Sequence, residues 1–134
     1  MTARRAIAAL PIAGIMLLSL IACQTVEPAP PVAGKSASLR VMEQVATAAH
    51  KCWFASGDPT FRAYRMANEL DSHSGRPRFL LVPATNYGGL PLLVVQAAGS
   101  SSNVEVFGPL MQQTSAARIS TDIQRWRTGD DSCV

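Results

Sequence analysis

Phe79-Leu80-Leu81-Val82 is a continuous apolar run enclosed by Pro77 and Pro83, and it fixes the centre of the fold. A second apolar run, Leu90 to Val95, begins directly after a pair of glycines. Runs this short and this apolar, bounded by proline or glycine, are typical of buried strands. We therefore expect both runs to be central strands of one sheet.

The connections between these segments predict antiparallel pairing. The loop PATNYGG at 83–89 joins the two apolar runs and presents one exposed tyrosine, Tyr87. Asn103 to Phe107 alternates polar and apolar residues, which is typical of a strand with one wet face. The turn AGSSSN joins this segment to the run before it, and connections this short join antiparallel strands.

The segment at 59–70 supports two interpretations. Asp58-Pro59 resembles a helix start, with a capping acid followed by a proline in the first turn. The aromatic residues and the mixed alternation from Phe61 to Leu70 favour a strand instead. We predict a strand over Phe61 to Leu70, followed by a turn at 71–75 that leads through Arg76-Pro77 into the central run.

Amphipathic periodicity predicts a helix at each end of the sheet. Ser36 or Ser38 is a candidate cap for the first helix and Thr114 or Ser115 for the last, which Gly129 ends. The first helix has an apolar face of Leu39, Met42, Val45, Ala46, Ala49, Cys52 and Trp53, and the last has one of Ala116, Ile119, Ile123 and Trp126. Opposite the last face, Arg118, Asp122 and Arg125 are spaced for weak surface ion pairs.

This order of elements predicts an α+β fold: an N-terminal helix, a three- to four-stranded antiparallel meander, and a C-terminal helix packed on one sheet face. The helices should cover that face through Met42, Trp53, Ile119, Ile123 and Trp126, and leave the other face more polar. Because both helix faces end in tryptophan, we expect Trp53 and Trp126 to share an aromatic cluster.

The first residues have the layout of a secretory signal. Arg4 and Arg5 precede an uncharged apolar run from Ala6 to Ala22, and Pro11 and Gly14 interrupt this run. Its 17 residues lie at the lower limit for spanning a bilayer, so a removable signal is favoured over a permanent anchor. We predict a signal peptide at 1–22, a proline-rich tether at 23–35, and a single domain at 36–134.

Leu20-Ile21-Ala22-Cys23 resembles the lipobox of bacterial lipoproteins, in which a branched apolar residue and a small residue precede a cysteine. The resemblance implies a diacylglycerol on the Cys23 sulfur and cleavage between Ala22 and Cys23. Gln24 stands where an inner-membrane retention aspartate would be, which favours the outer membrane, facing the periplasm. The alternative is an ordinary cysteine in an uncleaved anchor. Otherwise the chain resembles, in layout alone, small uncharacterised envelope lipoproteins of Gram-negative bacteria.

Charge argues against a nucleic-acid partner. Two of the twelve basic residues, Arg4 and Arg5, leave with the signal, which leaves ten basic and nine acidic residues and a net charge of +1. A nearly neutral domain without a basic run lacks the electrostatic pattern of a nucleic-acid binder. The partners that we expect are the membrane, through the lipid, and an envelope protein or polymer.

Cysteine usage predicts a disulfide. If lipidation uses Cys23, then Cys52 and Cys133 remain as an even pair in an oxidising compartment. The alternatives are two free thiols or a metal site that adds His50 or Asp131. Because two cysteines this far apart lack compact metal-ligand spacing, we favour the disulfide and expect neither a metal nor another cofactor.

Candidate chemical groups are few. His50 falls on the polar face of the first helix, and Ser72-His73-Ser74 forms part of a turn, so we interpret both histidines as solvated. Glu69 and Asp71 are a possible carboxylate pair without assigned roles. Possible ligand or partner contacts are Tyr87 and three arginines that would meet across the first two strands, Arg65, Arg76 and Arg78. A solvated sheet edge is the alternative interpretation of these arginines.

These observations favour a lipid-anchored envelope protein with a disulfide-closed, non-enzymatic binding or structural domain. The first alternative is an inhibitor or small-ligand-binding lipoprotein. The second is a minimal envelope hydrolase, which would require His73 to meet Ser72, Asp71 or Glu69 in one cleft.

Overall fold

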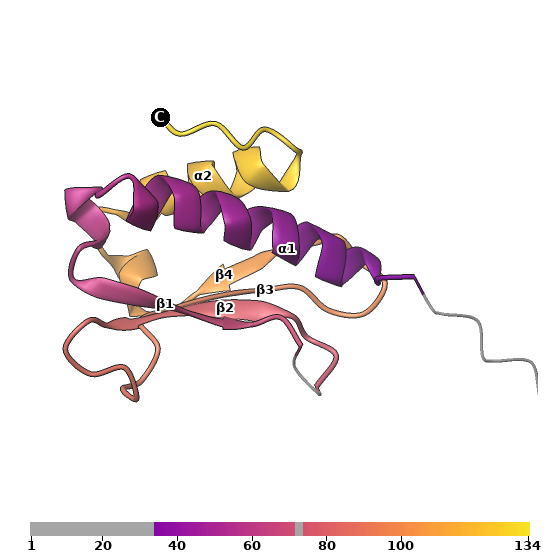
Figure 1. The fold of residues 1–134 in the computed structure, drawn as a ribbon, viewed down its shortest axis with the longest axis horizontal. Coiled ribbons are helices and arrows are strands. Elements are labelled where there is room, and N and C mark those ends of the chain that lie inside the picture. Colours follow the sequence, from indigo (N-terminus) through magenta and orange to yellow (C-terminus); the bar gives the residue numbers. More distant parts are fainter. Residues whose placement is uncertain (1–33, 72–73) are drawn as a thin grey trace, which may run out of the picture. The chain divides into compact units, whose positions relative to one another are not determined.

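Along the chain, one α-helix precedes a four-stranded antiparallel sheet and a second α-helix follows it (Figure 1). The computed structural model describes residues 34–71 and 74–134. The elements are α1 (Ala37–Ala49), the π-helical η1 (His50–Ala55), the 3-10 helix η2 (Pro59–Phe61), β1 (Tyr64–Glu69), β2 (Arg78–Pro83), β3 (Leu93–Gln96), β4 (Glu105–Phe107), the 3-10 helix η3 (Pro109–Gln112) and α2 (Ala116–Arg127). The strand order β1-β2-β3-β4 is a meander, so the predicted α+β class is confirmed.

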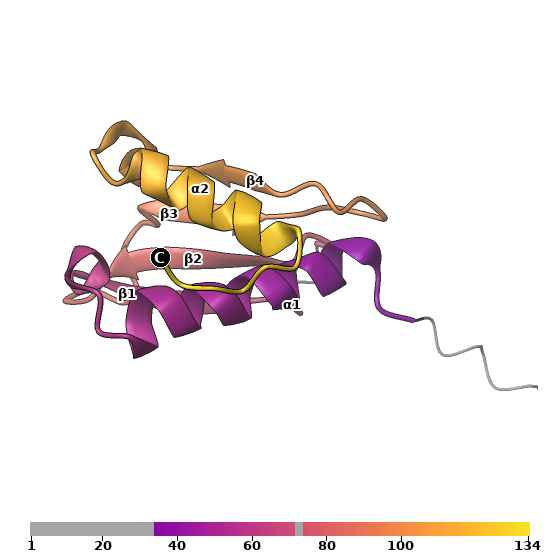
Figure 2. The same cartoon turned by 90° about the horizontal axis from the view of Figure 1, so that it is seen from above.

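Both helices lie on the same face of the sheet, α1 along the β1 side and α2 along the β3–β4 side (Figures 1 and 2). The buried residues beneath the helices include Phe79 and Leu81 of β2 and Val95 of β3. The predicted aromatic cluster is present, since the rings of Trp53 and Trp126 lie 5.0 Å apart. No helix among the described residues is both long enough and apolar enough to cross a bilayer.

The opposite sheet face is mixed rather than simply polar. Leu80 and Val82 of β2 point to it and are only 9% and 3% exposed. Charged side chains share this face near the ends of the strands, where Arg78 of β2 pairs with Glu69 of β1 at 2.5 Å. The prediction of a more polar face therefore describes its ends better than its centre.

The strand predicted over Phe61 to Leu70 was expected to start before the position where the observed strand β1 begins. Asp58 caps the 3-10 helix η2, because its Oδ1 accepts a hydrogen bond from the Thr60 amide at 2.8 Å. Pro59 fixes its own φ in the helical range and so favours this turn. Phe61 is buried and stacks on Trp53 with ring centroids 4.4 Å apart, and β1 begins only at Tyr64. Each of the two interpretations therefore describes part of the segment.

The third and fourth strands are shorter than predicted. Leu90 is 86% exposed and precedes β3, so the prediction that it belongs to a buried strand is wrong. Pro91 follows it and lacks the amide hydrogen that a central strand needs. Beyond β4, Gly108 has a φ of 128°, and a Cβ there would lie 2.6 Å from the Leu92 carbonyl oxygen. Glycine is therefore required where the chain leaves the sheet.

The structure selects one N-cap residue for each helix, where the sequence offered two. Ser36 caps α1, because its hydroxyl accepts a hydrogen bond from the Leu39 amide at 3.1 Å. Ser38 is buried inside the helix instead, and its hydroxyl donates to the Gly99 carbonyl at 2.6 Å. Leu39, predicted for the apolar face, is only half-buried. Ser115 is the N-cap residue of α2, although its side chain makes no capping hydrogen bond.

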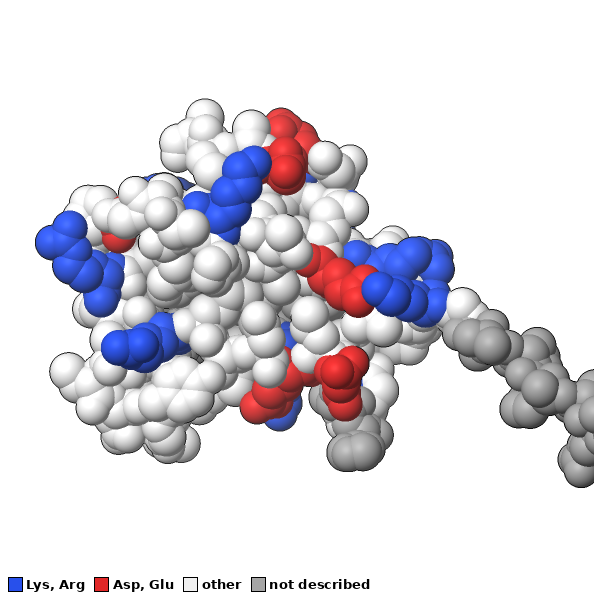
Figure 3. Space-filling view, viewed as in Figure 1, with Lys and Arg blue, Asp and Glu red and all other residues white. Residues whose placement is uncertain are grey.

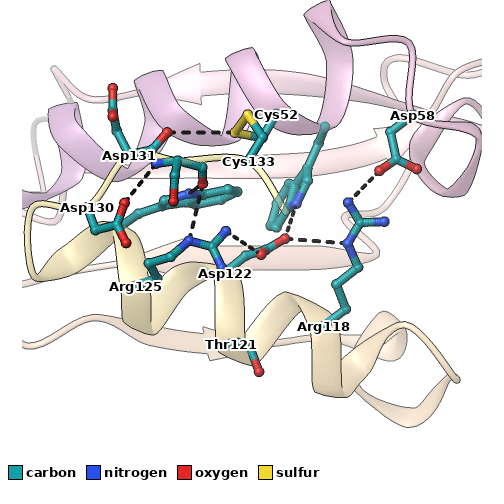
Figure 4. Close-up of polar contacts among 12 residues, drawn as sticks. Cys52, Asp58, Arg118, Thr121, Asp122, Arg125, Asp130, Asp131 and Cys133 are labelled. Atoms are coloured by element: carbon teal, nitrogen blue, oxygen red, sulfur yellow. Dashed lines mark hydrogen bonds and ion pairs between the residues drawn. A yellow bond between two sulfur atoms is a disulfide. The ribbon is translucent and has the colours of Figure 1, made fainter.

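A disulfide and a buried carboxylate hold α2 against η1 (Figure 4). The disulfide expected between Cys52 and Cys133 is present, with Cα atoms 5.2 Å apart. The predicted ion pairs of Asp122 with Arg118 and Arg125 are present, but Asp122 is only 3% exposed, so they form at a buried carboxylate rather than at the surface. Its carboxylate accepts hydrogen bonds from Trp53 Nε1 at 2.8 Å and from Arg125 Nη2 at 2.7 Å. Helical spacing predicts which residues of α2 are neighbours of Asp122, but it does not show that Trp53 of η1 covers Asp122.

Candidate functional site

A trough follows the free edge of β1. One hollow of about 330 Å³ lies at the start of the strand and is lined by His50, Phe54, Arg62, Tyr64, Arg65, Met66, Ala84 and Tyr87. A second, of about 240 Å³, lies toward its end and is lined by Ala46, Thr47, His50, Asn68 and Leu70. Because His50 lines both hollows, we treat them as one feature, the β1 trough.

The helix-side wall of the trough comes from α1 and η1. Thr47, His50 and Phe54 lie along one side of this continuous helical segment. Its last turn is widened, because the Ser56 amide donates to the Lys51 carbonyl five residues earlier. A π-helical turn holds one residue more than an α-turn, which changes the direction of the side chains beyond it. Cys52 and Trp53 are buried in this turn, while Phe54 reaches the trough.

The floor of the trough is a strand edge that pairs with no strand in the described part of the chain. In an antiparallel pair, bonded and non-bonded positions alternate along the strand. The Ala84 amide donates to the Ala63 carbonyl at 2.8 Å, and the register therefore makes Arg65 the next bonded position. Tyr64 and Met66, like Asn68, occupy the non-bonded positions. Their amide and carbonyl groups point away from β2, at the outer edge of the sheet.

The far-side wall comes from the loop after β2. The Asn86 amide donates to the Pro83 carbonyl at 3.1 Å, and the Gly89 amide donates to the Asn86 carbonyl at 2.9 Å. A Cβ on Gly89 would lie 3.0 Å from that carbonyl oxygen, so this tight turn favours glycine. Between these two turns Tyr87 is held with 60% of its surface exposed. The wall therefore presents an aromatic ring on a well-bonded loop.

The start of the trough is positively charged. Arg62 and Arg65 line it together with His50, and no described acidic residue lines either hollow. Among the residues that the structure describes, Arg62 makes no ion pair, and Arg65 is engaged only by Nε donating to the Ala84 carbonyl at 3.3 Å. Figure 3 shows basic groups at the end where β1 begins and acidic groups where it leads into the following turn. The trough therefore carries positive charge where β1 begins, and acidic side chains lie beyond its other end.

Asp58 lines a neighbouring hollow together with Arg62, but it does not neutralise this end of the trough, because it is already paired. Arg118 Nη2 donates to its Oδ2 at 2.5 Å. Desolvation opposes ionisation of Asp58, but hydrogen bonds from Arg118 and Thr60 outweigh it and hold the pKa of Asp58 below its ordinary value. The carboxylate therefore stays ionised at neutral pH and holds the side chain that faces it from α2.

A larger hollow, of about 500 Å³, lies between α1 and the C-terminal segment, but most of its charged groups are already paired. The exception is Arg40, which makes no ion pair with a described residue and donates from Nη1 to the Lys35 carbonyl at 2.5 Å. Lys35 pairs with Glu43 at 2.7 Å, and Asp131 pairs with Lys51 at 3.3 Å. The side-chain amide of Gln44 donates to the Trp126 carbonyl. Because these groups bind one another, this hollow offers less to a ligand than the β1 trough does.

The structure brings together two of the four predicted contact residues. Arg65 and Tyr87 both line the trough. Arg78 is opposite Glu69 and ion-paired with it, and Arg76 is exposed and does not line either hollow. The predicted meeting of three arginines is therefore wrong, because the register places Arg65 opposite Val82, four positions from the Glu69 pair.

Sequence reasoning missed most of the trough. The residues not predicted as contacts are His50, Phe54, Arg62, Tyr64 and Met66. His50 is on the polar helix face, as predicted, but this face borders the edge of β1 rather than open solvent alone. The signal available in the sequence was the spacing of Thr47, His50 and Phe54 along one side of the helix.

Other candidate groups are placed elsewhere or cannot be placed. Cys23, Ser72 and His73 lie outside the described residues. Glu69 is bound to Arg78, so it does not form an independent pair with Asp71. The described residues hold no group of three or more His, Cys, Asp or Glu side chains arranged to bind a metal.

The arrangement of the trough is suited to binding through charge, aromatic contact and backbone hydrogen bonds. No protein-family model, curated protein or solved structure matches this chain.

Proposed function

We propose that this chain is a lipid-anchored protein of the cell envelope whose folded domain binds an anionic envelope partner without catalysis. The observation that carries the proposal is the β1 trough. It combines two arginines free of ion pairs among the described residues, Arg62 and Arg65, with the aromatic side chains of Phe54, Tyr64 and Tyr87. Arginine and tyrosine are enriched at the energetic centres of binding interfaces.

Rigidity of the trough supports a binding role. Its helix-side wall belongs to η1, which the disulfide at Cys52 and the buried contacts of Trp53 hold in place. A site whose walls are ordered before binding loses less conformational entropy when a partner arrives. Both walls are fixed in this way, since the Tyr87 loop is closed by its own hydrogen bonds.

A small-ligand role is less favoured by the same site. Small-molecule pockets bury most of the ligand in a concave, mainly apolar cavity. The trough instead has exposed polar side chains at its rim, the charged Arg62 and Arg65 and the imidazole of His50, and it extends along a strand. This shape is better suited to an elongated partner.

The binding proposal is tested by photo-crosslinking in cells that express the full chain. A photoreactive amino acid replaces Tyr87, and the matched control carries it at Gln124, an exposed residue of α2 that lines neither hollow. We expect a discrete crosslinked species from position 87 that position 124 does not give. Equal labelling from both positions, or none from position 87, would contradict a partner at the trough.

The anchor is tested separately. Intact mass and metabolic acyl labelling compare the wild-type chain with Cys23→Ala. We expect acyl incorporation and loss of residues 1–22 in the wild type, and neither in the variant. A wild-type chain that keeps those residues would remove the anchor from the proposal without affecting the trough.

A further inference from the structure

We propose that the partner's contact segment is an extended, acidic stretch of polypeptide that pairs with β1 as a fifth strand of the sheet. This inference rests on the proposed binding function and specifies its partner. Three features occur together at the edge of β1: the outward-facing backbone groups of β1, two successive hollows along that edge, and a cationic end.

The outward-facing backbone groups of β1 are arranged to hydrogen-bond to another strand. Tyr64, Met66 and Asn68 each direct one amide and one carbonyl outward from β2, so the edge presents three donors and three acceptors at every second residue. Binding proteins use such edges to add an extended peptide, with affinity from main-chain hydrogen bonds and specificity from alternate side chains. The β1 trough lies directly over these groups.

The hollow at the start of β1 wraps around the edge from both faces of the sheet. On the helix side it is lined by Phe54, Tyr64 and Met66, with His50 beside them, and on the opposite side by Arg65 and Tyr87. A strand laid along the edge would send successive side chains alternately to these two sides. The helix side suits apolar residues and the opposite side suits carboxylates, so acidic and apolar residues should alternate in the partner.

A second copy of this chain fits the edge less well than a single strand. In both views α1 lies over the β1 side of the sheet (Figures 1 and 2). A second copy joined edge to edge would bring its own α1 to the same place, whereas a peptide carries no helix. An anionic polymer would satisfy Arg62 and Arg65, but it would leave the amides of Tyr64 and Met66 without main-chain partners.

Amide exchange distinguishes these occupants residue by residue. The full chain, purified in detergent, is mixed with a short synthetic peptide of alternating aspartate and valine. We expect the amides of Tyr64, Met66 and Asn68 to exchange more slowly, by about tenfold or more, since each would gain a hydrogen bond. The amides of Arg65 and Ala67 should not change, because they already bond to β2.

Three control peptides isolate each part of the proposal. One has the same composition with aspartates and valines in separate blocks, one is methylated on alternate amide nitrogens along a single edge, and one has lysine in place of aspartate. We expect each to bind at least about tenfold more weakly, because each removes several interactions of roughly 1 kcal/mol.

A charge exchange tests the cationic end. Arg65→Glu should weaken binding of the aspartate peptide and strengthen binding of the lysine peptide. Arg127→Glu is the matched control, because Arg127 is exposed on α2 and lines neither hollow. It should leave both affinities within about twofold of the wild type.

Two results would overturn strand addition while leaving a partner at the trough. The first is tight binding of the blocked or methylated peptide without slowed amides, which would indicate an anionic polymer. The second is slowed amides at Tyr64, Met66 and Asn68 without any peptide, together with a dimeric mass, which would indicate self-pairing. Failure of every peptide would likewise reject the strand, whereas absence of crosslinking from position 87 would reject the trough itself.

Discussion

The two arginines Arg118 and Arg62 show how differently this molecule treats its two sides. Arg118 lies between the carboxylates of Asp58 and Asp122 (Figure 4). It also lies over the ring of Phe61, with its Cζ atom 5.6 Å from the ring centroid. Arg62, next to Phe61 in sequence, makes no ion pair with any described residue. One side of the domain is closed by its own charges, and the other keeps its charges available.

The contacts of the closed side also fix the position of residues on the open side. Trp53 donates to Asp122 on the closed side, while the next residue, Phe54, lines the trough. The same turn of η1 therefore serves both regions. Substitutions on the closed side should lower stability, and substitutions in the trough should change binding at nearly constant stability.

The largest expected effect comes from the disulfide. Replacing both Cys52 and Cys133 by alanine should lower the free energy of unfolding by roughly 4 kcal/mol, because the bridge closes a long loop in the unfolded chain. Urea unfolding of the double variant measures this change, and reduced wild type is the control. A loss of less than about 1 kcal/mol would show that the C-terminal segment is held mainly by other contacts.

The buried carboxylate comes next. Asp122→Ala should cost about 3 kcal/mol, because it leaves the buried Trp53 indole N–H without its acceptor and removes the carboxylate that pairs with Arg125. Denaturant unfolding measures the loss. Gln124→Ala, exposed on the same helix, should remain within about 0.5 kcal/mol of the wild type. Equal effects of the two substitutions would contradict the closed network.

A smaller and pH-dependent effect is expected at Asp58. Asp58→Asn keeps an oxygen to cap η2 but loses the ion pair to Arg118, which should cost about 1 kcal/mol at neutral pH after solvent screening. The pKa of Asp58 in the fold is below its ordinary value of 3.8. The stabilisation is therefore complete above that value and is lost as the pH falls through the lower folded pKa.

Unfolding free energies measured for both proteins from neutral pH to strongly acidic pH test this sign. The gap between wild type and Asp58→Asn should be constant at neutral pH and should close on the acidic side of the ordinary carboxyl range. A gap that widens with acid would mean that desolvation of the carboxylate dominates.

The smallest effect on stability is expected in the trough. Arg62→Glu combined with Arg65→Glu should change the free energy of unfolding by no more than about 0.5 kcal/mol, since both side chains are exposed. The same variant should no longer bind the aspartate-rich peptide. Thermal unfolding and peptide titration on one preparation measure both properties, and a large loss of stability would show that these arginines belong to the fold.

The sequence was sufficient for the fold because its strongest patterns are local. Proline-bounded apolar runs and helical spacing predicted the central strands and both helices, and their order predicted the meander. The predicted strand boundaries near Pro59 and Leu90 were wrong because the cap at Asp58 and the missing amide hydrogen of Pro91 override the hydrophobic pattern.

The candidate site was less predictable because it depends on tertiary neighbours. Arg65 and Tyr87 were chosen as exposed polar or aromatic groups, and they do share the trough. Asp122 was assigned to the surface because its burial is created by Trp53, far away in the sequence. Likewise, which backbone edge is free follows from strand order and register, and helical spacing does not carry that information.

The direction of α1 has a consequence for where the cationic groups would face. At a rise of about 1.5 Å per residue, α1 extends roughly 20 Å from Ala37, and Phe54 and Arg62 lie beyond its far end. A partner that contacts Arg62 would therefore approach the domain at the end of α1 opposite Ala37.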